Sequence, residues 1–206
     1  MRASSSIIPT NVIVAAAASP SEFEVSEARP SQPLNLAAND FEIFQLPERY
    51  CIDVKALEHS WKALQKQAHP DMHAQADQAA QRLSMQWSVR VNEAYQRLKN
   101  PMKRAAYLCE LKGQSIDAET NTAMPNEFLL QQMEWRETLD AAETTSQAED
   151  LLQDVRSMKN ALLAEFEQIL DVQNDLKLAA QKVRALMFVE RFIQAVMHRI
   201  DQLDRA

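Results

Sequence analysis

The residues best suited to chemistry are His69 and Asp71, which flank Pro70 in the tripeptide His69-Pro70-Asp71. An imidazole and a carboxylate this close could act as a general acid and base. An enzyme would also need a third group to position them, a glycine-rich phosphate loop or a set of metal ligands. The sequence offers none of these around the tripeptide, so we expect that the chain is not an enzyme.

A metal site is a second possibility, because His69, His73 and Asp77 recur every four residues. This spacing places ligands on one face of a helix, but only an unbroken helix can use it, and Pro70 interrupts the interval. The two cysteines, Cys51 and Cys109, are far apart and form no C-x-x-C pair, which is typical of packing residues in a reducing compartment. We expect no metal and no cofactor.

The segment before the tripeptide has the spacing of an amphipathic helix. Its apolar residues recur every three or four positions: Val54, Leu57, Trp61 and Leu64. Asp53 stands at its N-cap position, and Lys62 and Lys66 lie off the apolar stripe, so the solvent side is basic. Because Pro70 ends the helix, we expect Asp71 in an exposed loop.

A second helix is predicted from Asp77 to Leu98, antiparallel to the first. Its buried face is expected to contain Ser84, Trp87, Val91, Ala94, Tyr95 and Leu98. Asn100-Pro101 ends this helix, and a short helix from Met102 to Leu111 follows, before Gly113. A short element over 41–46 precedes all three.

This order of helices, with basic residues leading into the tripeptide and Asn92-Glu93-Ala94-Tyr95 after it, resembles the J-domain of DnaJ-type co-chaperones. Residues 39–206 as a whole resemble the HscB family, the J-type co-chaperones of iron-sulfur cluster assembly. The positions that match the family pattern are Phe41 to Leu46, Pro47, Arg49, Tyr50, Pro101, Arg104, Ala105, Tyr107 and Leu108. Met72 departs from it, since J-domains usually carry lysine directly after the tripeptide.

The second half of the chain predicts a three-helix bundle, with helices over 126–142, 148–170 and 175–203. The first of these helices is apolar on two opposed sides, with Phe128, Trp135 and Leu139 on one and Leu129, Leu130 and Met133 on the other. A three-helix bundle can fully bury only one of these two sides. Glu134 and Glu137 accompany the second side, which is therefore expected to be an exposed apolar patch with an acidic rim.

Phe188, in the last helix, lies about 200° from the line of Leu186 at the ordinary helical angle and sits with Arg184 and Arg191. We expect it to be an exposed anchor for a partner. The alternative for both surfaces is that they pack against the N-terminal half.

Composition supports an all-α class, because the chain has one glycine and eight prolines in 206 residues and no long alternating segment. No run of 18 apolar residues is present, so no membrane span is expected. Residues 39–112 carry eleven basic and nine acidic residues, whereas residues 113–206 carry nine and seventeen. The acidic half would be repelled by phosphate backbones, so nucleic-acid binding is not expected.

The expected organisation is a disordered tail over 1–38, a J-domain over 39–112, a linker over 113–125 and a scaffold-binding three-helix bundle over 126–206, in an L-shaped molecule. The tail is rich in Ser, Ala and Pro, its apolar run is short and interrupted, and it is poor in arginine. We therefore expect a bacterial-type cytoplasmic protein in preference to one of the mitochondrial matrix.

The resemblance implies a co-chaperone that binds the iron-sulfur scaffold IscU and stimulates the ATPase of a DnaK-type chaperone, HscA. It assigns chaperone binding to His69, Pro70, Asp71, Lys62 and Lys66. It assigns scaffold binding to Leu129, Leu130, Met133, Glu134, Glu137 and Phe188. The alternative is a general J-domain co-chaperone whose bundle holds a different client.

Overall fold

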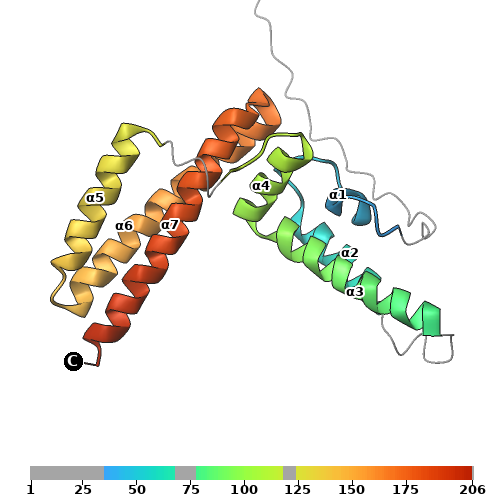
Figure 1. Cartoon of the computed structure of the whole chain (residues 1–206), viewed down its shortest axis with the longest axis horizontal. Coiled ribbons are helices and arrows are strands. Elements are labelled where there is room, and N and C mark those ends of the chain that lie inside the picture. The colour runs from blue at the N-terminus through green and yellow to red at the C-terminus, as the bar shows by residue number, and fades with distance from the viewer. Residues whose placement is uncertain (1–34, 68–77, 118–123, 206) are drawn as a thin grey trace, which may run out of the picture. The chain divides into compact units, whose positions relative to one another are not determined.

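The computed structural model describes residues 35–67, 78–117 and 124–205 (Figure 1). Within these ranges the chain forms helices and no strand, which confirms the all-α prediction. Several predicted features lie outside the described residues: His69, Pro70, Asp71, Met72, His73, Asp77, and the segments 1–34 and 118–123.

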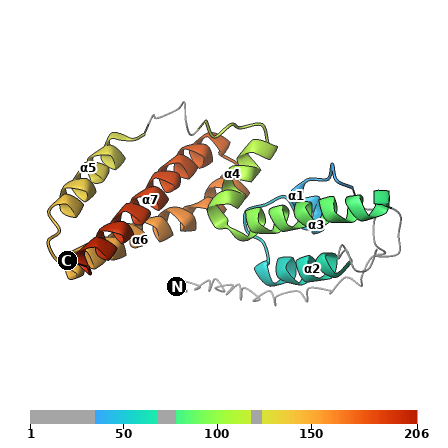
Figure 2. The same ribbon diagram turned by 60° about the horizontal axis from the view of Figure 1, so that its bottom comes forward.

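The N-terminal half consists of four helices: α1 (Asp40–Ile43), α2 (Val54–Gln67), α3 (Gln78–Lys99) and α4 (Pro101–Leu111). α2 and α3 lie side by side, as Figures 1 and 2 show from two directions. Residues 35–38 were expected to belong to a disordered tail. They instead form a turn in which the Ala38 amide donates to the Asn35 carbonyl at 3.1 Å, and Ala38 packs against the core.

The inner face of α3 is buried as the spacing predicted. Its buried residues are Ser84, Trp87, Val91, Ala94, Tyr95 and Leu98. Within the predicted apolar stripe of α2, Leu57 is fully buried, whereas Val54 is 43% exposed because the helix begins there. The predicted cap is present: the Asp53 carboxylate accepts the amides of Lys55 and Ala56 at 2.8 and 3.1 Å.

A buried carboxylate attaches α1 to α3. Asp40 is fully buried, and its two oxygens lie 2.7 Å from Arg90 Nη1 and 2.8 Å from Arg97 Nη1. Its amide donates to the hydroxyl of Tyr107 in α4 at 3.0 Å, and the Arg97 guanidinium lies over the Tyr107 ring. A charge can be buried at this place because two cations compensate it.

The C-terminal half consists of α5 (Asn126–Asp140), α6 (Thr145–Phe166), a π-helical turn η2 (Glu167–Gln173) and α7 (Leu176–Leu203). The three long helices pack into the predicted bundle (Figure 2). Thr144 and Gln147 begin α6 with a reciprocal capping box. The π turn was not predicted: we expected an ordinary helix to Leu170. Asn174 follows it in the left-handed conformation, at φ 52°.

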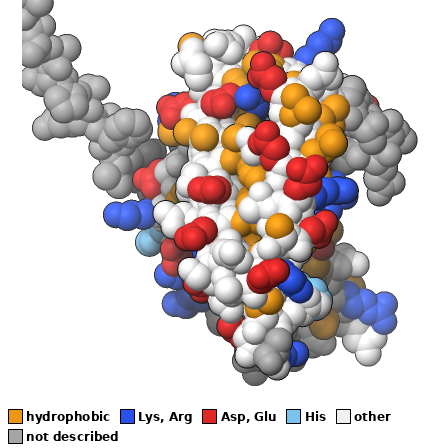
Figure 3. Space-filling view, turned by 90° about the vertical axis from the view of Figure 1, so that its left-hand side faces the viewer, with side chains coloured by type: hydrophobic (Ala, Val, Ile, Leu, Met, Phe, Trp, Pro, Cys, Tyr) orange, Lys and Arg blue, Asp and Glu red, His pale blue; other side chains and the backbone are white. Residues whose placement is uncertain are grey.

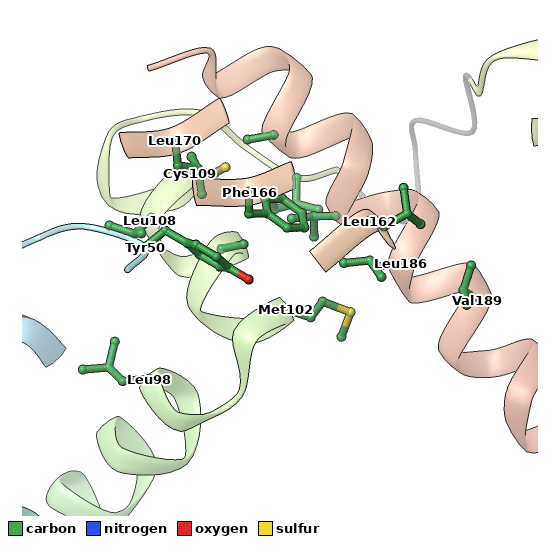
Figure 4. Close-up of a cluster of buried hydrophobic side chains, with 14 of the residues drawn as sticks. Tyr50, Leu98, Met102, Leu108, Cys109, Leu162, Phe166, Leu170, Leu186 and Val189 are labelled. Carbon is green, nitrogen blue, oxygen red and sulfur yellow. The ribbon is translucent and has the colours of Figure 1, made fainter. Parts of the chain in front are cut away.

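The two halves share one hydrophobic core, in which Phe166 and Tyr50 are central (Figure 4). Their rings lie 5.4 Å apart, and the Tyr50 hydroxyl donates to the Leu163 carbonyl at 3.3 Å. On the other side of Tyr50, the Arg104 guanidinium lies 4.8 Å from the ring centre. Burial is the main cause that raises the pKa of Tyr50 and lowers that of Arg104. The two halves are therefore joined by buried side chains that belong to the same core as those inside each half.

The η2 turn adds a polar contact between the halves. Asp171 accepts the amide of Tyr50 at 2.7 Å with one carboxylate oxygen and the amide of Cys51 at 2.8 Å with the other. Hydrogen bonds to an ionised acceptor are stronger than those between neutral groups. Lys112 reaches the Asn174 side chain at 3.0 Å close by.

Part of the expected linker belongs to the core instead. Ile116 is buried, and its carbonyl accepts a hydrogen bond from Arg184 Nη1 at 3.0 Å. The reason is that Gly113, in the left-handed conformation at φ 81°, turns the chain directly after α4 and brings it back toward α7.

The buried thiol of Cys109 is predicted to lower the unfolding free energy of the protein as the pH becomes alkaline. Burial is the main cause that raises the pKa of its thiol to about 11. Between the ordinary thiol pKa and this value, the unfolded chain loses the proton and the folded chain keeps it, so the unfolding free energy falls by up to about 1.4 kcal/mol per pH unit. Urea unfolding of wild type and Cys109→Ala between pH 8 and about 11 measures this effect. Equal pH slopes in the two proteins would contradict it.

Candidate functional site

The basic helix α2 presents Lys62 and Lys66 to solvent, as predicted. Lys62 Nζ lies 2.7 Å from the Glu58 carboxylate one turn earlier. The hydrogen bond and the charge of this carboxylate raise the pKa of Lys62, so the ammonium stays charged throughout the neutral range. Because Glu58 offsets part of the positive charge, the surface is moderately basic, which is suited to steering an acidic partner.

The Asn92-to-Tyr95 motif of α3 fixes the position of α2. The Trp61 ring stacks on Tyr95 with centres 4.4 Å apart, and its Nε1 donates to Asn92 Oδ1 at 3.0 Å. The side-chain amide of Gln65 donates to the same Asn92 oxygen. One side chain of α3 thus holds two successive turns of the basic helix.

Asn92→Ala is expected to lower the unfolding free energy by about 1 kcal/mol, because two donors on α2 lose their acceptor at an exposed position. Denaturant unfolding at neutral pH measures the change. Gln96→Ala provides the control: Gln96 is exposed one turn later on α3. If Gln96→Ala lowers the unfolding free energy by as much, the effect comes from a change in α3 and not from the hydrogen bonds to Asn92.

Helix α5 places its two apolar sides as predicted. Trp135 is buried and stacks on Phe192 of α7 with ring centres 5.7 Å apart. On the opposite side, Leu129, Leu130 and Met133 are 41%, 60% and 58% exposed. Glu134 and Glu137 are exposed beside them. We call these five residues the α5 strip.

Figure 3 looks onto the side of the molecule that carries α5. Hydrophobic side chains there alternate with carboxylates, which line much of this face. An apolar strip with an acidic rim suits a protein partner that offers apolar side chains with basic ones around them.

Phe188 is half-buried, so its prediction as an exposed side chain is wrong. Its ring meets Phe128 of α5 edge-on at 5.9 Å and stacks on Phe192 at 6.1 Å. Arg184 is directed away to the Ile116 carbonyl, while Arg136 of α5 approaches the Phe188 ring. Helical angles alone missed this arrangement because α5 covers that side of α7.

Within 35–67, 78–117 and 124–205, no group of three His, Cys, Asp or Glu side chains could hold a metal ion. No helix in those ranges is both long and apolar enough to cross a membrane.

Comparison with known proteins identifies the family. Residues 124–197 match the family model described as the HSCB C-terminal oligomerisation domain. The co-chaperone protein HscB homolog of Burkholderia thailandensis is 42% identical over 174 residues, which cover 83% of this chain and 99% of that protein. The homolog of Bordetella avium is 44% identical over 161 residues, covering 77% and 96%.

Solved structures agree with this assignment. The chaperone HscB from Vibrio cholerae superposes with a TM-score of 0.69 at 32% identity, covering 81% of this chain and 99% of that one. The human co-chaperone HscB has a TM-score of 0.73 at 24% identity, with coverage of 86% and 87%, and supports the fold alone. The relatives are named as co-chaperones and not as enzymes, and their matches extend over both helical halves. The chain belongs to the HscB family of co-chaperones.

Proposed function

We propose that this protein binds an IscU-type iron-sulfur scaffold and brings it to an HscA-type chaperone of the DnaK class, whose ATP hydrolysis it stimulates. Its task is to assist the transfer of iron-sulfur clusters during protein maturation. The chemistry belongs to the chaperone, and this chain supplies two binding surfaces held at a packed junction. Membership of the HscB family supports the proposal.

The α5 strip is the proposed binding surface for the scaffold. Three large apolar side chains stay exposed on a helix that packs against the bundle core with its opposite side, through Trp135, so their exposure has no role in that packing. Glu134 and Glu137 set the charge preference for a basic rim. Phe188 is half-buried and supports Phe128, the neighbour of Leu129 in sequence.

The chaperone surface in this proposal consists of Lys62, Lys66 and the tripeptide His69-Pro70-Asp71. In the sequence, the tripeptide stands between Gln67, the last residue of α2, and Gln78, the first residue of α3. In the proposed complex the Asp71 carboxylate pairs with an arginine of the chaperone, Pro70 and His69 shape the connection, and the lysines attract an acidic surface.

The proposed compartment is a bacterial cytoplasm. The relatives that match most of the chain are bacterial. Cys51 and Cys109 are both free thiols, which suits a reducing environment.

Single-turnover ATP hydrolysis by an HscA-type chaperone tests this function. We expect stimulation by the full chain that increases further with IscU and is lost in His69→Gln. Stimulation that does not depend on IscU would replace the scaffold by another client, as in a general J-domain co-chaperone. Absence of any stimulation would overturn the chaperone role of the tripeptide.

A further inference from the structure

A groove lies where α4 meets α6 and α7. Its lining contains no residue of the α5 strip. The groove encloses about 590 Å³, which is within the usual size range of small binding sites. Its lining residues are Met102 of α4, Lys159 of α6, and Met187, Glu190, Arg191, Ile193 and Gln194 of α7. The groove therefore joins the two helical halves and is distinct from the surfaces proposed above.

The inner lining of the groove is apolar and adaptable. Met102 and Ile193 are buried but for 9% and 8% of their surface, and Met187 is half-buried. Further along α7, Met197 is 42% exposed, three residues after Gln194 and so on the same side of the helix. Methionine side chains are flexible and polarizable, and they accept apolar side chains of different shapes. Such a lining suits a short apolar peptide segment better than a rigid ligand of one shape.

The groove is positively charged, although the C-terminal half, which supplies most of its lining, is negatively charged. Lys159 Nζ lies 2.9 Å from Glu190 Oε1, so these two charges offset one another. Arg191 is exposed, and its Nε donates to the Met187 carbonyl at 3.3 Å, which holds the guanidinium beside the apolar lining. The lining therefore has a net charge of one positive unit, whereas residues 113–206 are strongly acidic. A ligand with a carboxylate complements this groove, and one with a basic side chain does not.

We propose that this groove binds a short apolar peptide segment that carries a carboxylate side chain. The apolar side chains lie against Met102 and Met187, and the carboxylate pairs with Arg191. The exposed amide of Gln194 can donate to and accept from the peptide backbone. This is a second protein-binding site, opposite in charge preference to the α5 strip, and it does not depend on the proposed scaffold or chaperone.

The first experiment follows the methionine methyl groups of the full chain by NMR, with ¹³C-methyl label in its nine methionines. The probes are two synthetic peptides, acetyl-Leu-Ala-Glu-Leu-Leu-amide and its counterpart with Lys in place of Glu. We expect both to shift the Met102 and Met187 methyl signals and to leave Met133 unchanged. The Glu peptide is expected to bind about two- to fivefold more tightly, as for an exposed ion pair. No shift at Met102 and Met187 with millimolar peptide would overturn the proposal.

Three variants separate the contributions. Arg191→Gln is expected to abolish the preference for the Glu peptide, because the exposed cation is lost while the apolar lining remains. Met187→Gln is expected to weaken both peptides about tenfold, because a methionine contact is replaced by a polar one. Met133→Gln alters an exposed methionine of the α5 strip and is the matched control. Binding lost in Met133→Gln and kept in Met187→Gln would assign the peptides to α5 and overturn the groove.

Discussion

Replacing Leu130 and Met133 together by serine is expected to weaken binding of an IscU-type scaffold at least about a hundredfold. These are the two most exposed apolar residues of the α5 strip, at 60% and 58%. Large apolar side chains at the centre of an interface each contribute about 1.5–3 kcal/mol when a partner covers them. Isothermal titration calorimetry with the scaffold measures the loss. Because both side chains are exposed in the free protein, the unfolding free energy should change by less than about 0.5 kcal/mol per substitution.

The matched control for this prediction is Val172→Ser. Val172 is 67% exposed on η2 and lies on a different helix from the α5 strip. We expect it to leave scaffold binding unchanged. If the double variant binds the scaffold as wild type does, the α5 strip is not the scaffold surface, whatever the effect on ATP hydrolysis.

Asp40→Ala is expected to lower the unfolding free energy by about 3–5 kcal/mol, because removing one partner of a buried ion pair leaves charge uncompensated. Arg90 and Arg97 would both lose their carboxylate, and α1 would lose its attachment to α3. Urea unfolding measures the change. Asp201→Asn, at an exposed position of α7, is the control and should change stability by less than about 0.5 kcal/mol.

A second measurement distinguishes the ion pairs from general damage to α1. Asn39→Ala removes the capping box that begins this helix, in which Asn39 and Glu42 bond reciprocally. It should cost only about 1 kcal/mol, as N-cap replacements do. Equal losses in Asn39→Ala and Asp40→Ala would indicate that folding of α1, and not the buried charge, determines the effect.

The features that depend on helical periodicity were predictable from the sequence. The buried face of α3 and the two-sided character of α5 follow from side chains recurring every three or four residues, and every residue predicted on the α3 face is buried. Periodicity works here because each helix packs one side against a single neighbour or pair of neighbours. The family resemblance then supplied the function, which the helices alone could not.

The features that depend on contacts distant in sequence were not predictable. Asp40 looks like an ordinary acidic residue in the first turn of a helix, and only the arrival of Arg90 and Arg97 from α3 makes it a buried charge. Phe188 looked exposed because the side of α7 covered by α5 cannot be read from α7 itself. Asp171 was missed for the same reason, since its two amide partners lie about 120 residues earlier.

The π-helical turn η2 has a consequence for insertions and deletions. A π turn closes with one residue more than an α-helical turn, so it absorbs a single extra residue between two segments of regular helix. Upstream, the packing of Phe166 sets the register of α6, and downstream Asp171 must meet the amides of Tyr50 and Cys51. Deleting one residue within 167–170 is therefore expected to convert the turn to ordinary α-helix, while Phe166 keeps its place in the core and Asp171 still faces both amides. The segment η2, which links α6 to the contact between the two halves, can thus lose one residue without any change in how α6 packs within its bundle.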